Sequence, residues 1–152
     1  MILISVGTES RAFDRLMQWV ELLLKREFFP KDEEIVVHCG QGTTLPSGVV
    51  AYPTLSHEKL RGLLHNARLI ITHCGHDITS LLEESSATYI LVPRSPELGE
   101  CEGACQINLA ATLAQSGVPV AWSPGDLVRF IASPYRSNVP IQVDRSPASS
   151  RT

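Results

Sequence analysis

The residues Leu69-Ile70-Ile71-Thr72-His73-Cys74-Gly75 carry the pattern that decides the fold, an apolar run that ends in polar residues and a glycine. An apolar run without alternating polar residues is typical of a strand buried on both faces, as in a parallel sheet. It predicts a strand at 69–72. Similar runs predict strands at 2–6 and 35–39, and further strands are predicted at 49–52, 89–92 and 118–122.

Amphipathic segments separate these strands. The first predicts a helix from about residue 11 to residue 27 with Ser10 as its N-cap. Its apolar face consists of Phe13, Leu16, Met17, Val20 and Leu24. Further helices are predicted to about residue 66 after Ser56, at 77–86, at 103–116 and from Pro124 onward. Strands that alternate with helices of this length predict an α/β fold, a Rossmann-like parallel sheet with helices on both faces.

Composition predicts one folded domain. The chain has 152 residues, of which 43% are hydrophobic and 19% charged, typical of a globular protein. We predict that the domain spans residues 1–133 and that residues 134–152, rich in Ser, Pro and Arg, form a disordered tail. The net charge of −3 argues against a general nucleic-acid binder, which would carry a basic excess.

The sequence contains no run of about 18 apolar residues, the length that a membrane-spanning helix requires. Met1 leads directly into the first predicted strand, without the basic segment and cleavage site of a signal peptide. We therefore expect a cytoplasmic protein whose cysteines are thiols. They are Cys39, Cys74, Cys101 and Cys105.

Three of the predicted strands end in peptides that contain glycine, at residues 7–9, 40–43 and 73–76. Glycine lets backbone N–H groups approach a ligand closely, and two of these peptides precede predicted helix N-termini, where phosphate is favoured. Together they predict an anionic ligand such as a nucleotide, although each glycine alone is better explained by a tight strand-to-helix turn. The G-x-G-x-x-G, P-loop and G-x-S-x-G motifs are all absent from the sequence.

A metal site is not predicted. His73, Cys74 and His76 lie close together in the sequence, and Cys101 and Cys105 form a second pair. Structural zinc sites usually show closer cysteine pairs in both halves, and free cysteines at strand ends are often core residues.

Residues 68–117 are the most informative part of the sequence. They resemble the C-terminal half of family 28 glycosyltransferases, and the similarity extends over about residues 1–122. Within that family the chain is most similar to short proteins of the Alg13/PssE type. The family pattern of Val-Gly-Thr before Phe-Asp-x-Leu matches residues 6–8 and 13–16. The pattern around His-Ala-Gly matches residues 66–75, with His73 and Gly75 in register. A later pattern matches Val92-Pro93-Arg94, Gly99-Glu100, Gln106 and Ala110.

The chain departs from this pattern after Gly75. His76-Asp77-Ile78 stands where the family has x-Gly-Ser, and Leu81 stands at the position of a glutamate that is the expected ribose partner. Cys101 and Cys105 replace two histidines of the later loop.

The resemblance implies the donor-binding half of a GT-B glycosyltransferase, which binds a UDP-sugar without a cofactor. Gly7, Thr8, His73 and Gly75 would line the diphosphate, while Glu100 and Gln106 would face the sugar or ribose. It also implies a membrane-attached partner of the Alg14/PssD type that binds the acceptor, and a polysaccharide or lipid-linked glycan as product. The resemblance assigns no catalytic residue in this chain, because the base would come from the partner or a shared edge.

Two alternatives remain. In the first, the chain is a non-catalytic scaffold or regulatory subunit of the same fold, which the altered His76-Asp77-Ile78 segment favours. In the second, it is an unrelated nucleotide-binding α/β domain. The last predicted helix, with Leu127, Phe130 and Ile131, is either a partner surface or ordinary core.

Overall fold

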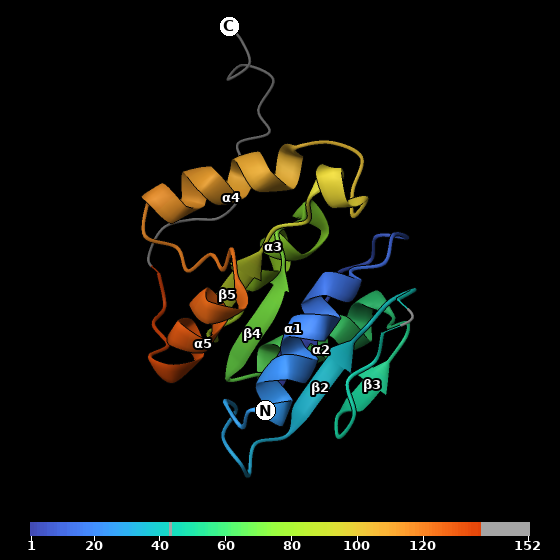
Figure 1. Ribbon diagram of the computed structural model, residues 1–152, viewed down its shortest axis with the longest axis vertical. Helices are drawn as coiled ribbons and strands as arrows, with labels where there is room; N and C mark the ends of the chain where they lie inside the picture. Colours follow the sequence, from blue (N-terminus) through green and yellow to red (C-terminus); the bar gives the residue numbers. More distant parts are fainter. Residues whose placement is uncertain (43, 138–152) are drawn as a thin grey trace, which may run out of the picture.

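The computed structural model describes residues 1–42 and 44–137, which fold around a parallel sheet (Figure 1). Within these residues the sheet has five strands in the order β3-β2-β1-β4-β5. The strands are β1 (Ile2–Ser5), β2 (Ile35–His38), β3 (Val50–Tyr52), β4 (Leu69–His73) and β5 (Thr88–Val92). All pairs of neighbouring strands are parallel, so the predicted Rossmann-like α/β fold is confirmed.

Strand β1 lies at the centre of the sheet. Ile2 pairs with Ile35 of β2 on one side and with Leu69 of β4 on the other. Because successive side chains of a strand point to opposite faces, Ile2 and Ile4 pack in one hydrophobic core and Leu3 packs in the other. Burial on both faces explains why the apolar run of this strand has no polar alternation.

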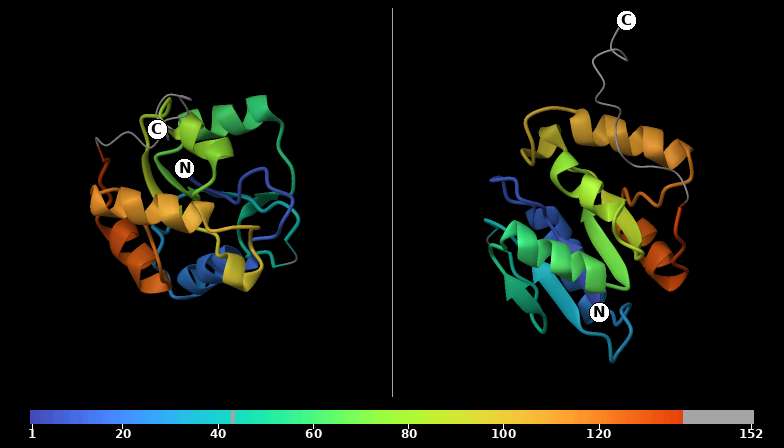
Figure 2. Two further views of the ribbon diagram at one scale, coloured as in Figure 1. Left: turned by 90° about the horizontal axis from the view of Figure 1, so that it is seen from above. Right: turned by 180° about the vertical axis from the view of Figure 1, so that it is seen from behind.

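Helices cover both faces of the sheet. Figure 2 shows α1 (Asp14–Lys25) and α5 (Pro124–Ala132) on one side, and α2 (His57–Asn66) and α3 (His76–Leu82) on the other. The fifth helix among the described residues, α4 (Cys105–Gln115), joins the core of α2 and α3 through Ala110 and Leu113. A short 3₁₀ helix, η1 (Pro96–Leu98), lies between β5 and α4.

The start of α1 differs from the prediction. The helix begins at Asp14 rather than near residue 11, its N-cap is Phe13, and Ser10 does not cap it. The carbonyls of Arg11 and Ala12 instead accept hydrogen bonds from the Arg94 guanidinium, so this segment is held away from the helical path.

The predicted strand at 118–122 is also wrong. A single bridge joins Val120 to Leu91, with hydrogen bonds from Leu91 N to Pro119 O and from Ala121 N to Leu91 O. Pro119 has no N–H to donate to a ladder. At the other end, the N–H of Trp122 turns to the Asp126 carboxylate, which ends the pairing and starts α5.

Most of the predicted tail lies outside the described residues. Its first part contacts the domain: the Tyr135 ring packs edge-on against Phe130, and its hydroxyl donates to the carbonyl of Gly117. Arg136 donates to the carbonyl of Ala87. Among the described residues, no helix is both long and apolar enough to cross a membrane.

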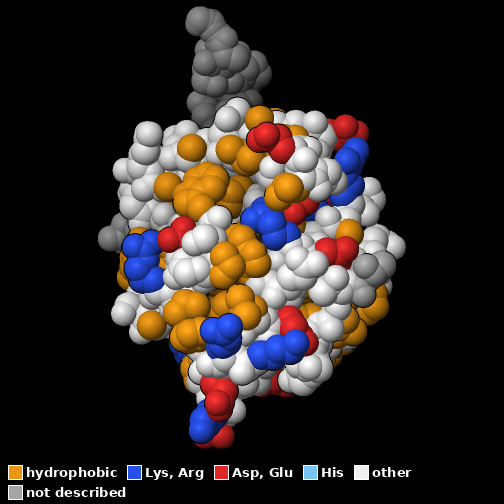
Figure 3. Space-filling view, viewed as in Figure 1, with side chains coloured by type: hydrophobic (Ala, Val, Ile, Leu, Met, Phe, Trp, Pro, Cys, Tyr) orange, Lys and Arg blue, Asp and Glu red, His pale blue; other side chains and the backbone are white. Residues whose placement is uncertain are grey.

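Helix α5 contributes to the core. Leu127 is fully buried, Ile131 is nearly so, and both pack in the cluster formed with α1 and the sheet. On the face of the molecule seen in Figure 3, which is viewed as in Figure 1, Lys, Arg, Asp and Glu side chains lie between the apolar side chains. The core interpretation of this helix therefore holds for Leu127 and Ile131, while Phe130 is only partly buried.

Replacing Leu127 with alanine should lower the free energy of unfolding by about 2–5 kcal/mol, because the change leaves a cavity in a closed core. Leu45, whose exposed fraction is 56%, is the matched control, and Leu45→Ala should change stability by less than about 0.5 kcal/mol. Urea unfolding measures both values. Equal effects of the two substitutions would contradict the assignment of α5 to the core.

Candidate functional site

The candidate site lies at the carboxyl ends of β1 and β4. The chain passes from β1 outward to β2 and β3, then returns to place β4 and β5 on the other side of β1. In open α/β sheets, ligands bind at such a reversal of strand order. Gly7 and Thr8 follow β1, while His73 ends β4 and Gly75 follows it, so these four predicted residues come together.

Three hydrogen-bond donors converge here on one carboxylate. The Thr8 backbone N–H and hydroxyl donate to Asp77 Oδ2 at 2.6 and 3.0 Å, and His73 Nε2 lies 2.9 Å from Asp77 Oδ1. We call the donors of Thr8 and His73 the anion cradle. They arise from the ends of two strands that are adjacent in the sheet, although Thr8 and Asp77 are 69 positions apart.

The hydrogen-bond network assigns the tautomer of His73. Arg94 Nε donates to His73 Nδ1 at 2.9 Å, and Gln106 Nε2 lies 3.3 Å from the same atom. Because Nδ1 faces these N–H donors, it acts as the acceptor and the proton resides on Nε2. The fully buried imidazole therefore points an N–H at the Asp77 carboxylate.

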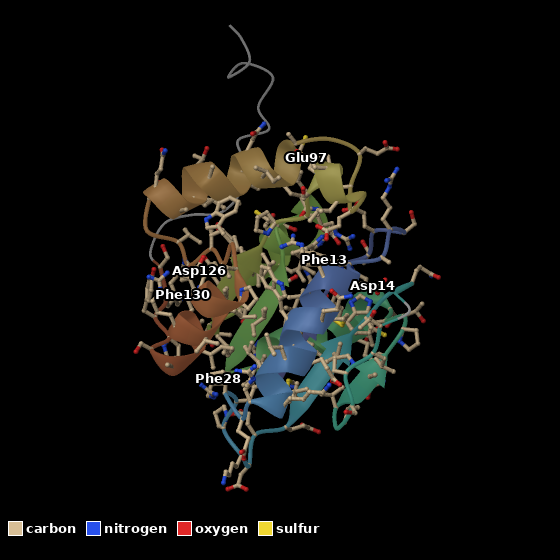
Figure 4. All side chains as sticks on the ribbon, viewed as in Figure 1. Phe13, Asp14, Phe28, Glu97, Asp126 and Phe130 are labelled. Carbon is tan, nitrogen blue, oxygen red and sulfur yellow. The ribbon has the colours of Figure 1, made fainter. Side chains whose placement is uncertain are left out.

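Arg94 links several segments around the site by hydrogen bonds. Its buried guanidinium donates to the carbonyls of Val6, Arg11, Ala12 and Glu100 as well as to His73. The Arg94 Cζ lies 4.9 Å from the centre of the Phe13 ring, and Figure 4 shows Phe13 at the start of α1, where many side chains crowd together. The sequence pattern includes Arg94, but we did not predict it as a site residue.

Glu100 and Gln106, the residues expected to face the sugar or ribose, are bonded within the protein. The Glu100 carboxylate pairs with Arg15 at 2.9 and 3.0 Å and accepts from the Ser95 N–H. Gln106 Oε1 accepts from the backbone N–H groups of Cys74 and Arg94. Their exposed fractions are 6% and 7%, and their contact with a ligand stays a prediction.

A cavity of about 240 Å³ adjoins the cradle at the ends of β1, β2 and β3, and its lining includes Gly7, Thr8, His38 and Leu55. Ser5 Oγ accepts from the Gly7 N–H and lies 2.9 Å from His38 Nδ1. Burial lowers the pKa of His38, which favours its neutral form. No hydrogen bond joins His38 Nε2 to another of the described residues, and the His38 side chain lines the cavity.

Asp77 remains ionised within the cradle. Burial alone would raise the pKa of this carboxyl, but the hydrogen bonds that it accepts from His73 and Thr8 outweigh burial. The pKa is therefore held well below its usual range. From the sequence, Asp77 was noted only as a departure from a family pattern. Its position four residues after His73, near the start of a predicted helix, could have indicated a contact between the two side chains.

The four cysteines are free thiols, and only Cys105 is exposed. Cys74 is a core residue, as the sequence suggested, and burial raises its pKa to about 12. Within residues 1–42 and 44–137, no three His, Cys, Asp or Glu side chains are grouped so that they could hold a metal ion.

No protein-family model and no curated protein sequence matches the chain. Among solved structures, the chain is similar to the glycosyltransferase SnogD from Streptomyces nogalater, with 18% sequence identity and a TM-score of 0.48. The similarity covers 86% of this chain and 43% of that chain, so this chain spans less than half of the SnogD chain.

Gly7→Ala should destabilise the protein far more than Gly48→Ala. Both glycines have positive φ, 79° and 80°, and alanine costs about 1–2 kcal/mol in that region. A Cβ at Gly7 would also collide with the His73 ring and the Asp77 carboxylate, whereas a Cβ at Gly48 meets no atom within 4 Å. We expect about 1–3 kcal/mol more loss at Gly7 by urea unfolding. Equal losses would show that the cradle does not crowd Gly7.

Asp77 should also make stability depend on pH. Because its pKa is lower in the folded protein than its ordinary value of 3.8, its contribution is present above that value and is lost as the pH falls below it. The difference in unfolding free energy between the wild type and Asp77→Asn should therefore be constant from pH 7 to 5 and shrink toward pH 2. Urea unfolding across this range measures it, and a difference that does not change would refute the ionised carboxylate.

Proposed function

We propose that the chain is the donor-binding domain of a two-component GT-B glycosyltransferase that binds a UDP-sugar. Its partner would be a membrane-attached, acceptor-binding chain of the Alg14/PssD type, and its product a polysaccharide or lipid-linked glycan. The observation that carries the proposal is the convergence of Thr8 and His73 donors on one anion at the reversal of strand order. The family resemblance of residues 1–122 supports the identity of that anion as a nucleoside diphosphate.

The two neighbouring spaces fit the two parts of such a ligand. The diphosphate would replace the Asp77 carboxylate on the cradle, since phosphate oxygens accept the same N–H and O–H donors. The nucleoside would occupy the adjoining cavity, which shares Thr8 with the cradle and whose ionisable lining residues are Glu9 and His38. His38 Nε2 would offer this uncharged part a hydrogen bond.

The reaction needs little covalent chemistry from this chain. The acceptor hydroxyl attacks the anomeric carbon, the new glycosidic bond forms, and the bond from that carbon to the diphosphate oxygen breaks. A base on the partner takes the hydroxyl proton, and UDP leaves with the bonding electron pair. The cradle stabilises the charge that develops on the diphosphate, as fixed donors do in other transfer reactions.

Glu100 and Gln106 enter this proposal mainly as supports. Gln106 fixes the amides of Cys74 and Arg94, and Glu100 fixes Ser95 and Arg15, so both shape the loops beside the cradle. A direct contact of either side chain with the sugar or ribose requires it to release one of these bonds.

A second candidate function is a non-catalytic scaffold or regulatory subunit. The observation that favours it is the Asp77 carboxylate itself, which already satisfies all three cradle donors. In that case the residues of the site would serve stability, and no nucleotide would displace the carboxylate.

A thermal-shift titration with UDP, ADP, GDP and UMP tests the proposal. A ligand at 100 times its dissociation constant adds about 2.7 kcal/mol, which raises the midpoint by roughly 5–10 °C for a chain of this size. We expect the largest shift with UDP, and a smaller one in Thr8→Val, which loses a cradle donor.

Thr112→Val is the matched control, because the Thr112 hydroxyl donates to a backbone carbonyl on the surface of α4. It should leave the UDP shift unchanged. No shift with any nucleotide would favour the scaffold, and a larger shift with ADP would favour an unrelated nucleotide-binding domain.

A further inference from the structure

The cradle holds an anion that belongs to the chain. Both oxygens of the Asp77 carboxylate are engaged, Oδ2 by Thr8 and Oδ1 by His73. These donors come from strand ends, and the tautomer of His73 aims its proton outward at the carboxylate. The arrangement is thus built to bind negative charge, and Asp77 supplies it.

A second observation points to a ligand beside the carboxylate. His38 has an exposed fraction of 3%, yet its Nε2 has no hydrogen-bond partner among the described residues, and the side chain lines the adjoining cavity. The cavity wall therefore offers a ring nitrogen that a ligand group can contact. The cavity and the cradle share Thr8, so one ligand can reach both.

The charge around the cradle disfavours an added anion while Asp77 stays in place. Glu9 lies 3.9 Å from His73 Nδ1 and 3.7 Å from Arg94 Nε, so a second carboxylate faces the same group of side chains. Arg94 directs its N–H groups mainly at backbone carbonyls, and Arg15 is paired with Glu100. A phosphate that entered beside Asp77 would meet like charge at close range.

The carboxylate is able to leave without disturbing the sheet. The Asp77 side chain has an exposed fraction of 28%, and it belongs to the first turn of α3 rather than to a strand. His73, by contrast, is fully buried and stays fixed by Arg94. The exchange therefore moves one side chain while the donors keep their positions.

We propose that Asp77 is a specificity-determining residue, a tethered competitor that a ligand phosphate must displace from Thr8 and His73. Asp77 thereby weakens the binding of every anion at this site and admits only a ligand whose other part gains enough in the neighbouring cavity. The naming of that ligand as a UDP-sugar rests on the proposed function, whereas the competition for the cradle does not.

Isothermal titration calorimetry with inorganic pyrophosphate, and separately with UDP, tests this role. Asp77→Asn keeps the size of the side chain and removes its charge, so pyrophosphate should bind at least tenfold more tightly than to the wild type. Asp126→Asn is the matched control, because Asp126 also lies in the first turn of a helix and accepts a backbone N–H, but it does so at α5. This control should bind pyrophosphate as the wild type does.

Asp77→Ser gives a second route if Asp77→Asn folds poorly, since its shorter neutral side chain removes the charge and also opens the cradle, and it should show the same increase. Unchanged pyrophosphate affinity in a folded Asp77 variant would overturn the inference. If the variants bind pyrophosphate more tightly than the wild type does, but bind UDP no more tightly than pyrophosphate, the competition is supported and the nucleotide is rejected as the ligand. Strong UDP binding that is equal in the wild type and both variants would leave the proposed function standing and reject the competition.

Discussion

The guanidinium of Arg94 is the interaction on which the site and the surrounding loops depend. Burial of a charged group costs several kcal/mol unless hydrogen bonds compensate for it. Here they come from the end of β1, the segment before α1, the loop after η1 and the ring of His73. The backbone carbonyls of the three chain segments accept these hydrogen bonds outside any strand or helix, so Arg94 and the three segments satisfy one another.

Strands β1, β2 and β4 were predictable because each is a local apolar run that is buried along its whole length, and this signal does not depend on distant residues. The helix start at Asp14 and the single bridge at Val120 were not. At Arg11 and Ala12 the outcome depends on an arginine more than 80 positions away, which takes their carbonyls as acceptors. At 118–122 it depends on the Asp126 carboxylate, which accepts a hydrogen bond from the N–H of Trp122. Ser123 and Ser56, whose capping partners are three residues ahead, follow the local rules.

The candidate site also has one part that could be predicted from the sequence and one part that could not. The strand-end glycines and His73 could be grouped from the sequence, because the carboxyl ends of parallel strands share one edge of a sheet. What those residues bind could not be read locally, since Asp77 meets Thr8 only after β1 and β4 pair. Pattern matching treated Asp77 as a missing glycine, whereas the fold gives its carboxylate three donors of its own.

The bridge at Val120 has a consequence for how the molecule can associate. A sheet grows when an edge strand offers its free N–H and C=O groups to another strand. Beyond β5, the edge carries a segment whose Pro119 has no N–H and whose chain turns at once into α5. At the other edge, β3 has only three residues, Val50–Tyr52. Both margins of the sheet are thus poor templates for strand addition, which leaves loops and helix faces as the surfaces through which another chain can bind.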